Sequence, residues 1–164
     1  GADDVLVVTR KGMSIRFRET AARDRSRAAG GVKAVNLRPG DHVVSADIVR
    51  EGATLLVVGE HGYGKRTPLD EYRVQGRGGT GIMTMNVTDK TGEIVGAEVV
   101  EDEDRLLLLT ANGKGIRVKV KEIRLVKRVA QGVKLIDLAA GDTIGSLARL
   151  VAGPEEDDEE EGED

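Results

Sequence analysis

Short apolar runs alternate with glycine-bearing turns along most of the chain, and the same arrangement occurs three times. Residues 5–17 read VLVVTRKGMSIRF, residues 55–67 read LLVVGEHGYGKRT and residues 106–118 read LLLLTANGKGIRV. Each copy is an apolar run, a turn with glycine and a second run that carries basic residues. This pattern is typical of two β-strands joined in a hairpin.

A second half follows each hairpin at a matching distance. It begins GVKAVNL at residue 31, GIMTMNV at residue 81 and GVKLIDL at residue 132, and each copy closes on an apolar run. Those closing runs reach Val49, Val100 and Val151, which are 51 residues apart both times. The spacing predicts three repeats, about 5–52, 53–103 and 104–153, each with four short strands.

These repeats predict an all-β, propeller-like fold, because four strands in about 50 residues are typical of a propeller blade. Alternation of Arg117 and Lys119 with valines predicts a strand with one basic and one apolar face. No sustained helical period is present, although residues 19–29 could hold a helical turn. Three blades do not close a ring, so we expect either self-association through exposed blade edges or a longer array.

Charge is strongly segregated along the chain. The 164 residues contain 25 Lys and Arg against 29 Asp and Glu, a net charge of −4, but residues 155–164 alone carry nine acids. Without that segment the net charge is +5. A block of like charge with nothing apolar does not fold, so residues 154–164 are expected to form a disordered acidic tail behind a basic folded part, residues 1–153.

The basic residues of the folded part recur at related positions in successive repeats. The first and third repeats carry net charges of +5 and +6, and the second carries −4. A repeated basic stripe fits a phosphate backbone, although ordinary solvated faces are the competing interpretation. The predicted DNA-contacting residues are Arg10, Lys11, Arg16, Arg18, Lys33, Lys65, Arg66, Arg73, Arg77, Lys114, Arg117, Lys119, Lys121, Lys127, Arg128 and Lys134.

Composition excludes several other classes of function. The chain has no cysteine for a disulfide or a thiolate, and two tyrosines, one phenylalanine and no tryptophan are too few to stack bases. His42 and His61 lack partners at metal-ligand spacing, so no metal site is predicted. No apolar run is long enough to span a bilayer and no signal peptide opens the chain, which fits the cytoplasm.

Two glycine motifs match nucleotide-binding patterns in spacing only. Residues 59–65, GEHGYGK, have P-loop spacing, but Arg66 replaces the Ser or Thr that would hold magnesium and no helix follows. Residues 76–81 fit GxGxxG but run into a strand instead of a helix. With no catalytic constellation, we expect no enzyme activity and no cofactor in these repeats.

Residues 71–82, EYRVQGRGGTGI, carry a resemblance to a known family. This segment resembles the C-terminal domain of bacterial DNA gyrase A subunits, whose repeats carry a Gln-Arg-Arg-Gly-Gly-Lys-Gly box. The box-like loop reads Gln75, Gly76, Arg77, Gly78, Gly79, Thr80 and Gly81, and departs from the full box at Gly76 and Thr80. Flanking segments and the acidic tail are also similar, so the resemblance covers residues 3–164.

The resemblance implies a β-pinwheel, a disc of usually six four-stranded blades, of which this chain looks like the last three. It implies a basic rim that binds and bends double-stranded DNA to support ATP-dependent negative supercoiling by a type IIA topoisomerase. The implied partners are the remainder of the gyrase A subunit and the gyrase B subunit, in the bacterial cytoplasm at the nucleoid. ATP, magnesium and the catalytic tyrosine would lie outside this chain, and Tyr63 and Tyr72 match no catalytic position.

Two alternatives remain open on the residues alone. One is a protein-interaction propeller fragment, and the other is the C-terminal domain of a topoisomerase IV-like relative. The acidic tail adds a further hypothesis, because nine tethered acids can compete with DNA for a basic rim. Deletion of residues 154–164 would then tighten DNA binding at low salt, whereas unchanged affinity would make the tail a solubility device.

Overall fold

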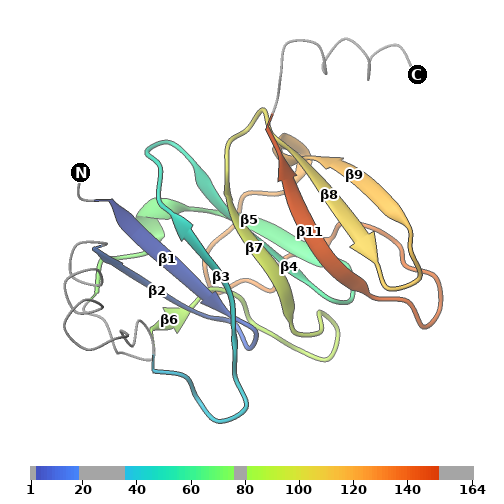
Figure 1. The fold of residues 1–164 in the computed structure, drawn as a ribbon, viewed down its shortest axis with the longest axis horizontal. Helices are drawn as coiled ribbons and strands as arrows, with labels where there is room; N and C mark the ends of the chain where they lie inside the picture. The colour runs from blue at the N-terminus through green and yellow to red at the C-terminus, as the bar shows by residue number, and fades with distance from the viewer. Residues whose placement is uncertain (1–2, 19–35, 76–80, 152–164) are drawn as a thin grey trace.

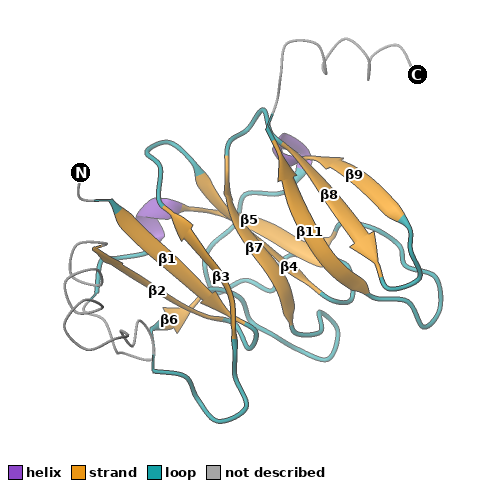
Figure 2. Ribbon diagram, viewed as in Figure 1, coloured by secondary structure: helices purple, strands orange, loops and turns teal. Residues whose placement is uncertain are grey.

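A computed structural model describes residues 3–18, 36–75 and 81–151 of the chain. Strands dominate this part of the chain, and its helical segments are two 3-10 turns, η1 (Leu69–Glu71) and η2 (Val120–Glu122). Figure 1 shows the strands as three successive sheets from the N-terminal to the C-terminal side, and Figure 2 separates strands from turns and loops. The predicted all-β fold with propeller-like blades is confirmed.

The first sheet is built from β1 (Asp4–Thr9), β2 (Met13–Arg18), β3 (Val43–Ile48) and β6 (Ile82–Met83). Their order is β3-β1-β2-β6, and each neighbouring pair is antiparallel. The apolar run of β1 is almost wholly buried, as expected for a central strand. Gly12, with φ 98°, allows the tight turn from β1 to β2.

The second sheet repeats this arrangement with β4 (Thr54–Gly59), β5 (Tyr63–Pro68), β7 (Ile94–Val100) and β10 (Val133–Lys134). Its order is β10-β5-β4-β7. The third sheet holds β8 (Arg105–Thr110), β9 (Gly115–Lys119) and β11 (Ile144–Leu150) in the order β11-β8-β9. Among the described residues, therefore, the third sheet has three strands where the other two have four.

The fourth strand of each complete blade comes from the next repeat. β6 belongs to the second repeat but pairs with β2 of the first, and β10 belongs to the third repeat but pairs with β5 of the second. The second and third repeats do contain four strands each, as predicted, but the four strands of one sheet do not all come from one repeat. Residue patterns identify strands but do not say which strands pair, because pairing depends on the path of the chain.

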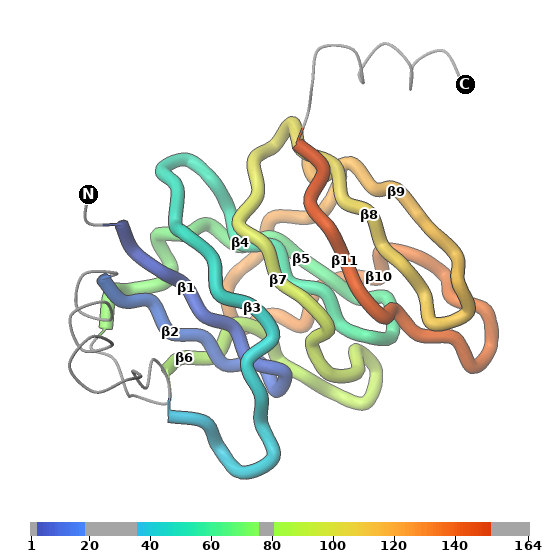
Figure 3. Tube along the Cα trace, in the orientation of Figure 1, coloured from blue at the N-terminus to red at the C-terminus, as the bar shows by residue number. Residues whose placement is uncertain are grey.

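Neighbouring blades pack face to face through two apolar clusters. Leu6 and Val8 of the first blade belong to a cluster with Leu55, Val57 and Val99 of the second. The opposite face of β4 packs with β8, η2 and β11 of the third blade in the second cluster. The central blade is thus buried on both faces, while β3, β7 and β11 follow one another along one side (Figure 3).

Candidate nucleic-acid interface

The sheet order separates an inner side of the array from an outer side. β3, β7 and β11 form the inner edges, whereas β2, β5 and β9 lie toward the outer edges and lead into η1 and η2. Most of the predicted DNA-contacting residues lie on these outer strands and on the loops that follow them. The exposed ones among them include Arg73, Lys114, Lys121 and Lys127. Exposure on the outer side is what contact with a long DNA backbone requires.

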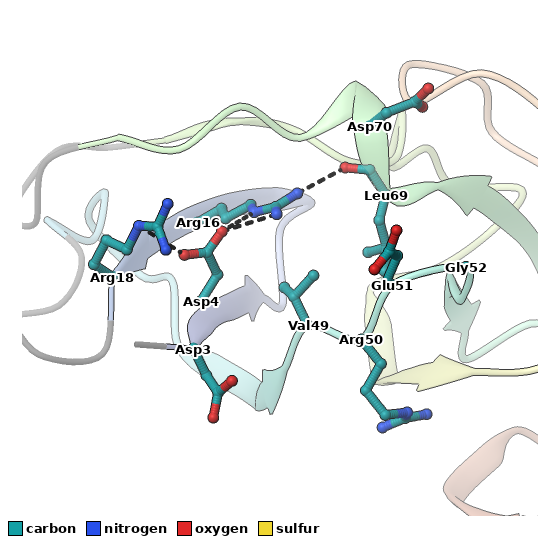
Figure 4. A pocket seen from close by; sticks show the side chains of 10 residues that line it. All are labelled: Asp3, Asp4, Arg16, Arg18, Val49, Arg50, Glu51, Gly52, Leu69 and Asp70. Carbon is teal, nitrogen blue, oxygen red and sulfur yellow. Dashed lines mark hydrogen bonds and ion pairs between the residues drawn. The ribbon is translucent and has the colours of Figure 1, made fainter. Parts of the chain in front are cut away.

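Arg16, at the same position of its repeat as Arg66 and Arg117, is not a surface base. Its Nε donates to Asp4 Oδ2 at 2.8 Å, and its Nη1 donates to the carbonyls of Leu69 and Tyr72, each at 3.1 Å. Figure 4 shows this guanidinium reaching from β2 toward the η1 segment. Arg16 therefore joins the first blade to the second, and its assignment as a DNA contact is corrected.

Arg66 makes the same kind of joint between the second and third blades. Its Nε donates to the Ile123 carbonyl at 2.9 Å, and its Nη1 lies 2.7 Å from Asp102 Oδ1. Its Nη2 donates to the Lys121 carbonyl at 3.5 Å. Because the side chain is buried, it cannot reach a phosphate, so the DNA-contact assignment of Arg66 is also corrected.

Lys65 is a buried lysine at a position where the other repeats carry isoleucine, Ile15 and Ile116. Its exposed fraction is 0 %, and its Nζ donates to the carbonyls of Lys127, at 3.0 Å, and Arg128. Burial lowers the pKa of Lys65 to about 8, an effect that Glu71 partly opposes. Lys65 thus anchors a loop of the third repeat to the second blade and is not a DNA contact.

The lowered pKa of Lys65 predicts a pH-dependent stability. Between pH 8 and 10 the unfolded chain holds a proton on Lys65 that the folded chain has largely released, so folding is favoured as pH rises. Relative to Lys65→Met, the wild-type free energy of unfolding should rise by about 2 kcal/mol across that range. Urea titrations of both chains at pH 8, 9 and 10 measure the difference, and a constant difference would contradict the assignment.

The loop that Lys65 holds is also fixed at Arg128. The Arg128 backbone N–H donates to Glu71 Oε1 at 2.9 Å, and its Nη1 donates to the Met83 carbonyl at 2.5 Å. Arg128 is half-buried by these contacts, whereas the neighbouring Lys127 is exposed. Lys127 is therefore exposed on a loop whose backbone is held in place by hydrogen bonds to Lys65 and Glu71 of the second blade.

Three further predicted bases are exposed or half-exposed but paired with acids. Arg10 Nε lies 3.0 Å from Glu93 Oε1, Lys134 Nζ lies 3.3 Å from Asp137 Oδ1, and Arg18 Nε lies 3.3 Å from Asp4 Oδ1. Figure 4 shows Asp4 between Arg16 and Arg18 in a shallow pocket of mixed charge. Exposed ion pairs contribute little to stability, so these bases can exchange an acid for a phosphate.

Part of the predicted set lies outside the described residues. This applies to Lys33, Arg77, Gly76, Gly78, Gly79 and Thr80, and likewise to residues 19–29 and 154–164. The two ends of the box-like loop are described: the Gln75 backbone N–H donates to the Arg16 carbonyl at 2.6 Å, and Gly81 has φ +83°. Both ends therefore contact the preceding blade.

Tyr72 and the first glycine motif are parts of the folded blades, whereas most of the second glycine motif, residues 76–80, lies outside the described residues. Tyr72 is buried with its hydroxyl oxygen 2.5 Å from Thr84 Oγ1, and burial raises its pKa to about 12. The P-loop-like segment, residues 59–65, forms the hairpin between β4 and β5. Among the described residues, no group of His, Cys, Asp and Glu is arranged to hold a metal ion. No helix in that part of the chain could cross a membrane.

Sequence reasoning missed a charged cluster on the inner strands. Asp47, Glu98 and Arg149 hold the same position in the three repeats. Asp47 and Glu98 line a groove of about 400 Å³ formed by β3, β7 and β11. Burial raises the pKa of Glu98, and the neighbouring Asp47 adds to the effect. Their common spacing of 51 residues was the available signal, but two acids and one base stand at these positions, which masks the equivalence.

These features define an array of propeller-like blades that are joined by buried arginines and carry exposed bases on the outer side. The family model described as DNA gyrase C-terminal domain, beta-propeller, matches residues 3–50, 53–101 and 104–149. The chain belongs to this family of DNA gyrase C-terminal domains.

Similar curated proteins and solved structures agree with this assignment. The DNA gyrase A subunit of Streptomyces coelicolor is 40 % identical over 98 % of this chain and 19 % of the relative. That of Kosmotoga olearia is 44 % identical over 91 % of this chain and 19 % of the relative. The chain thus spans about a fifth of the length of the curated relatives it matches.

Two solved structures show the same fold. A DNA gyrase A C-terminal domain superposes with a TM-score of 0.83 at 28 % identity, covering 92 % of this chain and 51 % of the other. The C-terminal domain of a DNA topoisomerase IV superposes with a TM-score of 0.81 at 24 % identity, covering 91 % and 47 % respectively. At that identity the second match supports the fold alone.

Proposed function

We propose that this chain is the DNA-wrapping part of a DNA gyrase A subunit, where it serves as a non-catalytic module that bends duplex DNA over its outer side. One observation carries the proposal: after the buried bases are removed, several exposed ones have no acidic partner among the described residues. They are Lys11, Arg73, Lys121, Arg124 and Lys127. Arg73 and Arg124 hold the same position in the second and third repeats, 51 residues apart.

Contacts of this kind act on the phosphate backbone. Exposed lysines and arginines neutralise phosphates without reading bases, so any sequence preference comes from the ease of bending the duplex. Bending 20–30 base pairs by 40–90° costs about 1–6 kcal/mol. A charge-assisted hydrogen bond contributes about 1.5–3 kcal/mol before desolvation, so several contacts are needed together. Repetition of the blade supplies bases at several points along the array.

The wider role follows from the relatives and belongs to a longer protein. The remainder of the gyrase A subunit and the gyrase B subunit are the proposed protein partners, in the bacterial cytoplasm at the nucleoid. ATP and magnesium would act in that larger assembly, and no cofactor is proposed for these repeats. A topoisomerase IV-like role is the second candidate, and the solved structure with a TM-score of 0.81 supports only its fold.

Removal of one exposed base tests the proposed surface. Lys127→Ala should weaken binding to duplex DNA several-fold and lower the slope of log affinity against log salt by about 0.9, because one phosphate contact is lost. Lys90→Ala is the matched control, because Lys90 is an exposed lysine of the acidic second repeat whose Nζ lies 5.4 Å from the Tyr63 ring centroid. Fluorescence anisotropy with a labelled duplex measures both variants. Equal effects of the two substitutions would contradict the proposed surface.

A further inference from the structure

The outer side of the array carries exposed apolar side chains among its exposed bases. The apolar ones are Val74, Met83, Leu125 and Val129, whose exposed fractions lie between 40 % and 52 %. Val74 and Leu125 hold the same position in their repeats, 51 residues apart, and each directly follows an exposed arginine. Single exposed apolar side chains are common on proteins, but recurrence at one repeat position beside a base indicates contact with a partner that is both apolar and anionic.

Leu125 is held in place by the outer strand of the second blade. The Arg66 backbone N–H donates to the Arg124 carbonyl at 3.0 Å, and the Val126 N–H donates to the Arg66 carbonyl at 2.9 Å. Leu125 thus lies in a parallel bridge with Arg66, between two hydrogen-bonded neighbours. A side chain on a backbone fixed in this way loses little freedom when it enters a partner.

Val74 is held in the same way on the first blade. It lies in a parallel bridge with Arg16, and the Gln75 N–H donates to the Arg16 carbonyl at 2.6 Å. Each of the two segments already gives one residue to the core, because Tyr72 is 1 % exposed and Ile123 is 2 % exposed. Packing inside the fold therefore does not account for the apolar residue that follows two positions later.

Exposed bases lie on both sides of Leu125 along the chain. Arg124 precedes it and Lys127 follows two positions later, and both are exposed without an acidic partner among the described residues. Bases of this kind bind phosphates. An apolar side chain between two phosphate-binding bases is placed to reach the base pairs of the same duplex.

We propose that Leu125 is an apolar wedge that enters the minor groove of duplex DNA between two base pairs, while Arg124 and Lys127 bind the flanking phosphates. Val74, next to Arg73, is the equivalent wedge on the first blade. The inference rests on the proposed function, because it requires DNA on the outer side. Wedges of this kind unstack a base step and kink the duplex by about 20–90°. The duplex is then bent at localised kinks and not smoothly, and pyrimidine–purine steps are the expected sites because they unstack most easily.

Two duplexes of about 30 base pairs separate a kink from a smooth bend. In the first, a run of pyrimidines is followed by a run of purines, so that the central TpA is its single pyrimidine–purine step. In the second, the two runs are exchanged, so that the central step is ApT and no pyrimidine–purine step is present. Dyes on the two ends report bending by energy transfer, and 2-aminopurine in place of the central adenine reports unstacking. At low salt, the full 164-residue chain should raise both signals on the first duplex and much less on the second.

A double variant removes both wedges, because either one can occupy the single TpA step. Val74→Ala/Leu125→Ala should lose the rise in 2-aminopurine fluorescence and most of the rise in energy transfer. Its affinity should fall only about threefold, because the cost of unstacking is saved together with the lost contact. The slope of log affinity against log salt should stay unchanged, because no charge is removed.

A second double variant is the matched control. Val43 on β3 is 47 % exposed, as Val74 is, and Leu109 on β8 is 43 % exposed, but neither lies on an outer strand. Val43→Ala/Leu109→Ala should kink the TpA duplex like wild type. Leu125→Phe keeps a large apolar side chain and should also retain both signals.

Equal 2-aminopurine fluorescence and energy transfer with the wild type and the Val74→Ala/Leu125→Ala variant, while binding still depends on salt, would overturn the wedge and leave the proposed function intact. No binding of either duplex at low salt would contradict the proposed function, and the wedge with it. Sedimentation of the chain without DNA should show a monomer. A dimer that the double variant dissociates would assign the apolar residues to contact with a second copy instead.

Discussion

Gly81→Ala is expected to lower the free energy of unfolding by about 3–4 kcal/mol. Gly81 has φ +83°, and a Cβ there would lie 2.0 Å from the Ser14 carbonyl oxygen and 2.8 Å from its carbon. Because both atoms belong to the backbone of β2, neither can move aside without shifting the strand. The substitution would separate β6 from β2 and weaken the joint between the first two blades, which urea denaturation followed by circular dichroism measures.

Gly52→Ala is the control for this variant. Gly52 has nearly the same conformation, φ +81°, but nothing lies within 4 Å of the position its Cβ would take. Only the cost of a left-handed backbone remains there, about 1–2 kcal/mol. Similar losses in the two variants would show that close approach of the repeats is not what requires glycine at position 81.

Arg66→Ala should cost about 3 kcal/mol of the free energy of unfolding, the second large effect that we expect. The substitution removes three donors and leaves the Ile123 and Lys121 carbonyls without that partner at the joint between the second and third blades. It also removes the 2.7 Å ion pair with Asp102. Guanidinium chloride or urea titration measures the loss.

Arg117→Ala is the matched control for Arg66→Ala. Its side chain holds the same position in its repeat but has no partner among the described residues, so the loss of stability should stay below about 0.5 kcal/mol. A loss at Arg66 as small as that at Arg117 would mean that the buried arginines do not hold the blades together.

The repeat period was enough to predict the blades. Glycine turns, apolar runs and the spacing of Val49, Val100 and Val151 lead directly to three similar four-stranded units. The period could not reveal that β6 and β10 pair with strands of the preceding blade. The sequence of a two-residue strand does not specify which neighbouring strand it pairs with. That choice is made by the three-dimensional path of the chain and by the close contacts of Gly81 and Gly132.

The site was predicted less well than the fold, for a reason that Arg16, Arg66 and Arg117 illustrate. One arginine in three equivalent places contacts carbonyls of the following repeat in two, and is exposed in the third, where the described residues include no following repeat. The sequence did contain a signal that Lys65 is buried, because it stands at the repeat position that Ile15 and Ile116 occupy on an apolar face. A base at an otherwise apolar repeat position is better interpreted as a buried anchor than as a surface contact.

The buried bases therefore stabilise the fold, whereas the exposed bases are proposed to bind DNA. Arg16, Lys65 and Arg66 join successive repeats. Lys65 also fixes the backbone at Lys127 and Arg128, and so determines where the exposed Lys127 side chain meets solvent. Variants of the buried bases should change stability first, whereas variants of the exposed bases should change DNA affinity and leave stability nearly intact. The same basic composition thus serves two roles that only burial distinguishes.

In the proposed function, exposed bases on the outer side bind the phosphate backbone of duplex DNA. The most direct test is the affinity of the chain for a duplex of about 30 base pairs, measured by anisotropy from low to physiological salt, without the acidic tail. We expect log affinity to fall linearly with log salt, with a slope of about −4 to −5 for some five phosphate contacts. An affinity that does not depend on salt, or no binding at low salt, would contradict phosphate binding by these bases.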